Sequence, residues 1–114
     1  MDFSQINEQL PIERFQHPVA TENQIDLRIL RLDKTHGEIS GNKWFKLKYN
    51  LLEARNRGIN KLLTFGGAYS NHIYAVAAAA KLFGFQSVGI IRGEEHIPLN
   101  PTLQFATDAG MHLH

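Results

Sequence analysis

Cysteine is absent from this chain of 114 residues. The protein can therefore form neither disulfide bonds nor thiolate metal sites, and the absence is typical of cytoplasmic proteins. The sequence also lacks any run of about 18 apolar residues, so no membrane-spanning helix is predicted. Neither sign of charge dominates, because 12 Lys and Arg residues and 11 Asp and Glu residues leave a formal net charge of +1. Scattered basic residues at this balance argue against a nucleic-acid partner.

Targeting and metal-binding patterns are missing as well. The first residues, Met1–Gln5, have neither the basic nor the apolar region of a secretion signal, which again favours the cytoplasm. The six histidines show no spacing typical of metal ligands on a helix, so no metal site is predicted. What is present, 43% apolar and 20% charged residues, is ordinary for a soluble globular protein.

The N-terminal part has little regular pattern. It contains Pro11 and Pro18 and no sustained period through Ala20. We predict a short helix or arm over Phe3–Leu10, followed by a loop. The alternation of apolar and polar residues over Ile25–Asp33 predicts a strand.

Regular elements are predicted along the rest of the chain. Apolar residues recur at intervals of three and four over Trp44–Arg57, which predicts a helix, and Gly58 follows as its stop. Beyond Gly58, short apolar runs alternate with helical segments. The expected order is strand Lys61–Phe65, helix His72–Phe83, strand Ser87–Ile91, a helix between Asn100 and Gly110, and strand Met111–His114. This order predicts an α/β fold with an open parallel sheet of buried strands. The last strand has barely begun when the sequence stops, so we expect a truncated protein.

The stretch Ser40–Lys43 places a lysine beside an asparagine at the start of a predicted helix. A lysine amine becomes a nucleophile toward carbonyl groups when desolvation or a neighbouring cation lowers its pKa. Asn42 would be placed to hydrogen-bond an aldehyde cofactor held by Lys43. The alternative is that Lys43, Lys46 and Lys48 only form a solvated helix face.

A second motif follows the next predicted strand. Gly66 and Gly67 end that strand at the edge where open α/β sheets place their ligands. Ser70, Asn71 and His72 then fall in the first turn of a helix, whose free N–H groups favour an anion such as a carboxylate. The alternative is plain helix capping by Ser70 after a tight glycine turn.

The pair of motifs resembles a known family. Ser40–Leu47 followed by Phe65–His72 is similar to the 1-aminocyclopropane-1-carboxylate deaminase and D-cysteine desulfhydrase family. The resemblance runs from about Leu27 to the end of the chain and includes Asn100–Leu103 and Ala109–Met111. These are fold-type II enzymes that depend on pyridoxal 5'-phosphate and are related to the tryptophan synthase β subunit. The two motifs at this spacing are much more specific than either alone.

The resemblance implies roles for particular residues. Lys43 would form the internal aldimine with pyridoxal phosphate and later move protons at the substrate carbon. Asn71 would hydrogen-bond the ring oxygen of the cofactor. Ser70 would bind the substrate carboxylate, and in the deaminase branch it is the proposed nucleophile on the cyclopropane ring. Asn42 and Lys46 would support the site.

The chain departs from the family pattern in three ways. Phe45 stands where the family has an arginine, so charge-based roles do not transfer there. Tyr69 and His72 stand where the deaminase branch has glutamine, and a histidine after Ser-Asn resembles the desulfhydrase branch. Both residues are candidates for substrate binding. The glycine-rich phosphate loop, the partner of the pyridine nitrogen and later aromatic residues have no counterpart. We therefore expect this chain alone to bind pyridoxal phosphate weakly or not at all.

The resemblance also implies an organisation and a function. Residues 1–57 would be the N-terminal segment and helix of a large domain, and residues 58–114 an incomplete small α/β domain. The intact protein would be a cytoplasmic homodimer, a lyase or hydrolase acting on a small amino acid of the 1-aminocyclopropane-1-carboxylate or D-cysteine type. Two alternatives stay open: a non-catalytic α/β fragment or binding module without cofactor, and a pyridoxal phosphate binding protein without the reaction. A substrate carboxylate site at Ser70 and Asn71 argues against the second.

Overall fold

The computed structural model describes residues 1–114 and contains two separate sheets. The larger sheet is parallel, in the order β3-β4-β5, and its strands are β3 (Lys61–Gly67), β4 (Gln86–Arg92) and β5 (Met111–Leu113). The helices α3 (Asn71–Phe83) and α4 (Pro101–Asp108) connect these strands in turn. The predicted α/β class and β-α-β-α-β order are confirmed.

Capping residues set the ends of the helices. Ser70 and Asn100 accept hydrogen bonds from first-turn amides of α3 and α4. Gly84 ends α3 with a φ of 72°, and Gly58, with a φ of 68°, follows helix α2 (Lys43–Asn56). Because a left-handed φ favours glycine, these stops could be predicted from the sequence.

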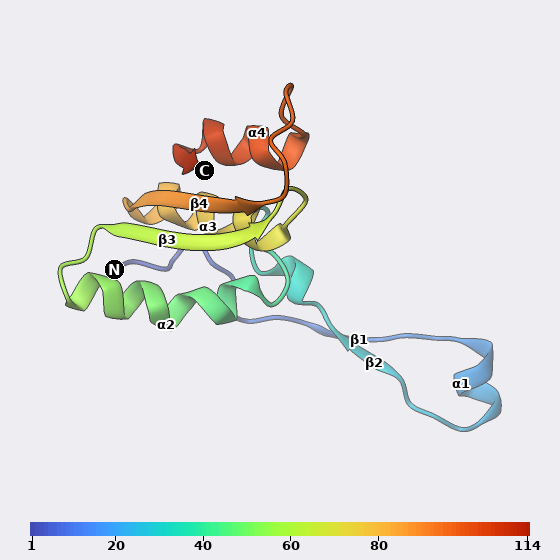
Figure 1. The fold of residues 1–114 in the computed structure, drawn as a ribbon. Helices are drawn as coiled ribbons and strands as arrows, with labels where there is room; N and C mark the ends of the chain where they lie inside the picture. Colours follow the sequence, from blue (N-terminus) through green and yellow to red (C-terminus); the bar gives the residue numbers. More distant parts are fainter.

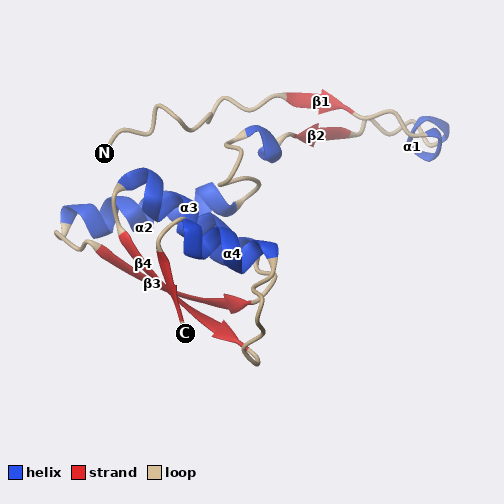
Figure 2. Ribbon diagram, turned by 90° about the horizontal axis from the view of Figure 1, so that it is seen from above, coloured by secondary structure: helices blue, strands red, loops and turns tan.

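The three long helices, α2, α3 and α4, lie on the same face of the parallel sheet (Figure 2). Helix α2 buries Trp44, Leu47, Leu51 and Ala54. Helix α3 is buried along most of its length, because its run of alanines lets it pack closely against its neighbours. Both helices belong to one core of 18 buried residues. Residues 1–57 and 58–114 therefore share a core in this chain, and their assignment to two domains stays a prediction.

The opposite face of the sheet is open. Leu63 and Phe65 of β3 have 61% and 67% of their surface exposed. The prediction of a buried strand is wrong for this face of β3, because helices cover only the other face (Figure 2). The apolar side chains that suggested burial are present, but nothing in this chain packs on them.

The segment Phe3–Leu10 is an arm and contains no helix. The ring of Phe3 packs edge-on against Trp44 and Phe83, with centroid distances of 4.9 Å and 5.3 Å. The indole Nε1 of Trp44 donates a hydrogen bond of 2.8 Å to Glu8 Oε1. These tertiary contacts, rather than a local period, hold the arm on the core.

A two-stranded antiparallel ribbon projects from this body (Figure 1). Its elements are β1 (Ile12–Arg14), the tip helix α1 (Pro18–Glu22), β2 (Arg28–Leu30) and the following 3-10 turn η1 (Leu32–Lys34). The strand predicted over Ile25–Asp33 is therefore shorter than expected, and α1 was not predicted. It begins at Pro18 after His17, whose ring nitrogen accepts from Val19 N.

The ribbon makes the chain unusually extended. Its radius of gyration is 17.3 Å, whereas a compact domain of this length has about 13 Å. The accessible surface is 7847 Å², against about 6300 Å² for a compact monomer of the same mass. Much surface that a compact protein would cover is thus exposed.

Candidate functional site

The first motif forms the start of helix α2. Asn42 occupies the N-cap position, but its side chain accepts no hydrogen bond from the helix. Its Oδ1 instead accepts a hydrogen bond of 2.9 Å from Lys43 Nζ. Gly41 precedes the pair with a φ of 64°, a conformation that favours glycine. The amine of Lys43, a partly buried residue, is therefore held by its own neighbour at the helix terminus.

The second motif forms the start of helix α3. Ser70 Oγ accepts hydrogen bonds from His72 N at 3.2 Å and from Ile73 N at 3.3 Å. A Cβ atom at Gly66 would lie 2.6 Å from Ile73 Cγ1 and 2.9 Å from Ser70 Oγ. Only glycine at this position allows the helix terminus to pack so closely on the end of β3.

His72, in the second motif, contacts β3 and senses the charges of the first motif. Its Nε2 lies 2.9 Å from the hydroxyl Oγ1 of Thr64, a buried residue of β3. Partial burial lowers the pKa of His72, and the positive charges of Lys43 and Lys46 lower that pKa further. Helices α2 and α3 contact each other, and their first turns both lie at the end of the sheet where β3 and β4 finish (Figure 1).

The other predicted site residues lie on the surface around this point. Asn42, Lys46 and Asn71 are exposed, and Tyr69 has 80% of its surface exposed. The charges of Lys43 and Lys46 act on His72, and Ser70 lies next to His72 at the start of α3. The side chains of Tyr69 and Asn71 have no hydrogen-bond partner within the chain.

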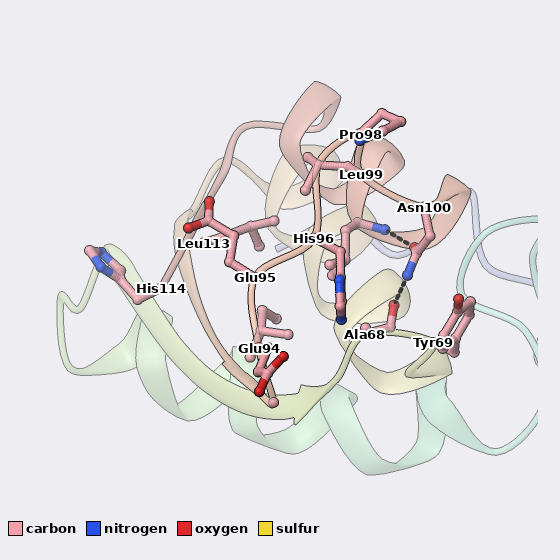
Figure 3. A pocket seen from close by; sticks show the side chains of 13 residues that line it. Ala68, Tyr69, Glu94, Glu95, His96, Pro98, Leu99, Asn100, Leu113 and His114 are labelled. Carbon is pink, nitrogen blue, oxygen red and sulfur yellow. Dashed lines mark hydrogen bonds between the residues drawn. The ribbon is translucent and has the colours of Figure 1, made fainter.

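A pocket of about 440 Å³ adjoins the second motif (Figure 3). It lies between the loop that carries Ala68 and Tyr69, the start of α4, and the segment after β4. Glu94, Glu95 and His96 contribute polar groups to its wall. The side chains of Lys43, Ser70 and His72 do not line it. The pocket is therefore a neighbour of the candidate site and not its centre.

Two residues near the site were not singled out from the sequence. Thr64 contacts His72, and Asn100 donates a hydrogen bond of 2.9 Å from Nδ2 to the carbonyl oxygen of Ala68 (Figure 3). The sequence did contain a signal for Thr64, because it is the only polar residue within the apolar run of β3. The sequence placed Asn100 only at the start of a predicted helix, because its contact with Ala68 joins residues far apart in the sequence.

No three His, Asp or Glu side chains come together in a way that would hold a metal ion. None of the helices has the length and apolar character needed to cross a membrane.

Comparison with known proteins finds relatives over most of the chain, although no family model matches it. A protein of Pyrococcus abyssi that carries the provisional name of a 1-aminocyclopropane-1-carboxylate deaminase is 40% identical over 77 residues, covering 68% of this chain and 23% of that protein. The bifunctional mitochondrial D-cysteine desulfhydrase/1-aminocyclopropane-1-carboxylate deaminase of Arabidopsis thaliana is 38% identical over 82 residues, covering 72% of this chain and 20% of that protein.

A solved structure is similar as well. This chain superposes on the crystal structure of an ACC (1-aminocyclopropane-1-carboxylate) deaminase homologue with a TM-score of 0.81 at 30% sequence identity. The match covers 97% of this chain and 33% of the other. The chain therefore spans a fifth to a third of the length of the relatives that it matches.

Proposed function

Because the chain is a homologue of the 1-aminocyclopropane-1-carboxylate deaminase and D-cysteine desulfhydrase family, we propose that the intact protein is a pyridoxal phosphate-dependent deaminase or desulfhydrase of a small amino acid. One observation in this chain carries the proposal. Helix α2, which begins at Lys43, and helix α3, which begins after Ser70, start at the same end of the sheet although these residues are 27 positions apart, and the positive charge of Lys43 lowers the pKa of His72.

The residues at this point fit part of a pyridoxal phosphate site. Lys43, a partly buried residue, supplies a primary amine that would hold the cofactor's aldehyde carbon. Asn71, exposed at the start of α3, has the amide donor that the ring oxygen would need. When bound, the cofactor supplies an electron sink for the substrate bond that breaks.

Ser70 fits the role of a carboxylate ligand. Its oxygen accepts two backbone amides, so the hydroxyl hydrogen stays free to donate to a bound anion. The N-terminal end of the 13-residue helix α3 adds a favourable electrostatic contribution for a negative charge. These two features would orient an amino-acid substrate by its carboxylate.

Lys43 and His72 fit the roles of proton carriers. Because burial and the nearby lysines lower the pKa of His72, its ring is neutral at pH 7 and can accept a proton. The amine of Lys43, once released from the cofactor, would move the proton at the substrate carbon. Asn42 would guide the amine through the hydrogen bond that it already makes.

The wider organisation is part of the same proposal. We assign residues 1–57 to a large domain and residues 58–114 to a small domain that continues beyond this chain. The intact protein would be a cytoplasmic homodimer. The open face of β3 and the ribbon support the homodimer, since both expose apolar side chains that further polypeptide would cover.

The test uses the intact protein with added pyridoxal phosphate and measures ammonia release from 1-aminocyclopropane-1-carboxylate and ammonia and sulfide release from D-cysteine. Lys43→Arg should abolish the activity, with a loss of about 10³-fold or more. Lys48→Arg is the matched control, because it lies on the same helix, pairs with Glu8 and keeps its charge. Full activity in Lys43→Arg, or no product from either substrate in the wild type, would refute the proposal.

A further inference from the structure

Asn100 makes two hydrogen bonds from the two ends of one amide group (Figure 3). Its Oδ1 accepts from Leu103 N at 2.9 Å, which caps helix α4. Its Nδ2 donates to the carbonyl oxygen of Ala68 at 2.9 Å, which reaches the loop between β3 and α3. A helix cap needs only the first bond, so the second requires a separate explanation.

Asn100 stands at the start of α4, a helix that is firmly packed. Pro101 fixes the first helical residue, and Leu103 and Ala106 are buried in the core. The ring of Phe105 stacks on Tyr74 of α3 with a centroid distance of 3.7 Å. Asn100 is therefore anchored on a packed helix and can hold a loop that is less well packed.

The loop that it holds carries the candidate site. Because a peptide unit is planar and trans, the N–H of Tyr69 points away from the Ala68 carbonyl and hence away from Asn100. That N–H has no hydrogen-bond acceptor within the chain. The next residue is Ser70, whose hydroxyl is also free to donate. The orientation of the Ala68–Tyr69 peptide thus decides where the N–H of Tyr69 is aimed. The same loop leads directly to Ser70, so its position also affects where the Ser70 hydroxyl lies.

We propose that Asn100 is a positioning residue, which ties the Ala68–Ser70 loop to α4 and so aims the Tyr69 N–H and the Ser70 hydroxyl at a carboxylate ligand. The identity of that ligand as an amino-acid substrate rests on the proposed function. The positioning itself does not, because it concerns contacts within this chain.

The first experiment separates the two bonds of Asn100 in the 114-residue chain. Asn100→Ser keeps a good helix cap but is too short to reach Ala68. The backbone order parameters of Ala68, Tyr69 and Ser70, measured by ¹⁵N relaxation, should fall from about 0.85 toward about 0.6. Those of Leu103 and Ala106 should not change.

Gln104→Gly is the matched control. It destabilises an exposed position of the same helix and leaves Asn100 in place. It should lower the melting temperature without changing the order parameters of the loop. If the loop stays as ordered in Asn100→Ser as in the wild type, or loosens equally in Gln104→Gly, Asn100 is only a cap and the proposal is wrong.

The second experiment uses the intact protein and asks about the ligand. Asn100→Ser should raise KM for the amino-acid substrate about 5-fold to 10-fold and change kcat less, because the donors would still be present but poorly aimed. If the loop loosens but KM does not change, Asn100 still orders the loop, and the claim that the loop donors bind the substrate carboxylate is wrong. Absence of any activity in the wild type would instead refute the proposed function, and the relaxation result would stand independently.

Discussion

His72 and Thr64 form a hydrogen-bonded pair, with 2.9 Å between the imidazole Nε2 and the threonine Oγ1. The threonine is buried in the middle of β3, and the histidine is the second residue of α3. Strand β3 therefore fixes the ring of His72. This is the histidine whose pKa is lowered by the charges of Lys43 and Lys46. This pair fixes the imidazole next to the start of α3, where the proposed function would need an oriented base.

Removing the hydroxyl of Thr64 should release that ring. Thr64→Val preserves the shape of the side chain but leaves His72 Nε2 without its partner, so we expect a loss of about 1 kcal/mol in the free energy of unfolding. The ratio of the two neutral His72 tautomers, read from ¹⁵N chemical shifts, should change. Thr64→Ser keeps the hydroxyl and should keep the ratio. An identical ratio in Thr64→Val would show that the pair does not orient the ring.

The pH dependence of stability follows from the lowered pKa of His72. The unfolded chain takes up a proton at about pH 6.5, whereas the folded chain resists protonation until a lower pH. The contribution of the neutral ring is therefore complete above about pH 6.5 and is lost as the pH falls below it. Between about pH 7 and about pH 5, the free energy of unfolding should fall more steeply in the wild type than in His72→Gln. Equal slopes would contradict this account.

Lys46 should act on His72 through its charge alone. Lys46→Gln removes one of the two positive charges that lower the pKa of His72, so that pKa should rise when it is followed by NMR titration. Lys48→Gln is the control on the same helix, since the charge of Lys48 is not among those that shift His72. A similar response to both substitutions would mean that α2 does not face α3 as described.

Gly66 should not tolerate a side chain. A Cβ atom there would lie 2.6 Å from Ile73 Cγ1, so Gly66→Ala should cost about 1–3 kcal/mol of stability and displace the start of α3. Gly37→Ala is the matched control, because no atom would lie within 4 Å of its new Cβ. Chemical denaturation of both variants measures the difference, and equal stabilities would argue against the close packing of α3 on β3.

The open face of the sheet should make the isolated chain associate. Phe65 and Leu63 expose most of their apolar surface side by side on β3. Phe65→Thr keeps the preference for strand structure and should shift sedimentation toward the monomer. Tyr49→Thr, at an equally exposed position of α2, is the control and should leave the association unchanged. No change on either substitution would locate the association elsewhere.

Much of the fold was predictable because each element after Gly58 has its own local signals. Ser70 and Asn100 mark where helices begin, and Gly84 marks where one ends. The N-terminal part was not predictable in this way. Phe3 and Glu8 are held by contacts with Trp44, and no local pattern reveals a partner so far along the chain.

The place of the two motifs in the fold was predictable to the same extent. The motifs around Lys43 and Ser70 indicated two helix termini with complementary chemistry, and the structure brings those termini to one end of the sheet. Thr64 and Asn100 were missed as site residues, since their contacts depend on tertiary packing. The roles assigned to Asn71 and Tyr69 stay predictions, because both side chains are exposed and make no hydrogen bond.

The central claim is that Lys43 holds pyridoxal phosphate, and borohydride reduction followed by peptide mass mapping tests it most directly. The intact protein and the 114-residue chain would each be incubated with the cofactor, reduced and digested. The account predicts that the cofactor is fixed at Lys43 of the intact protein, with Lys34, Lys46, Lys48, Lys61 and Lys81 largely unlabelled, and that the 114-residue chain is labelled weakly. Labelling of the intact protein spread evenly over these lysines, with no preference for Lys43, would contradict the account.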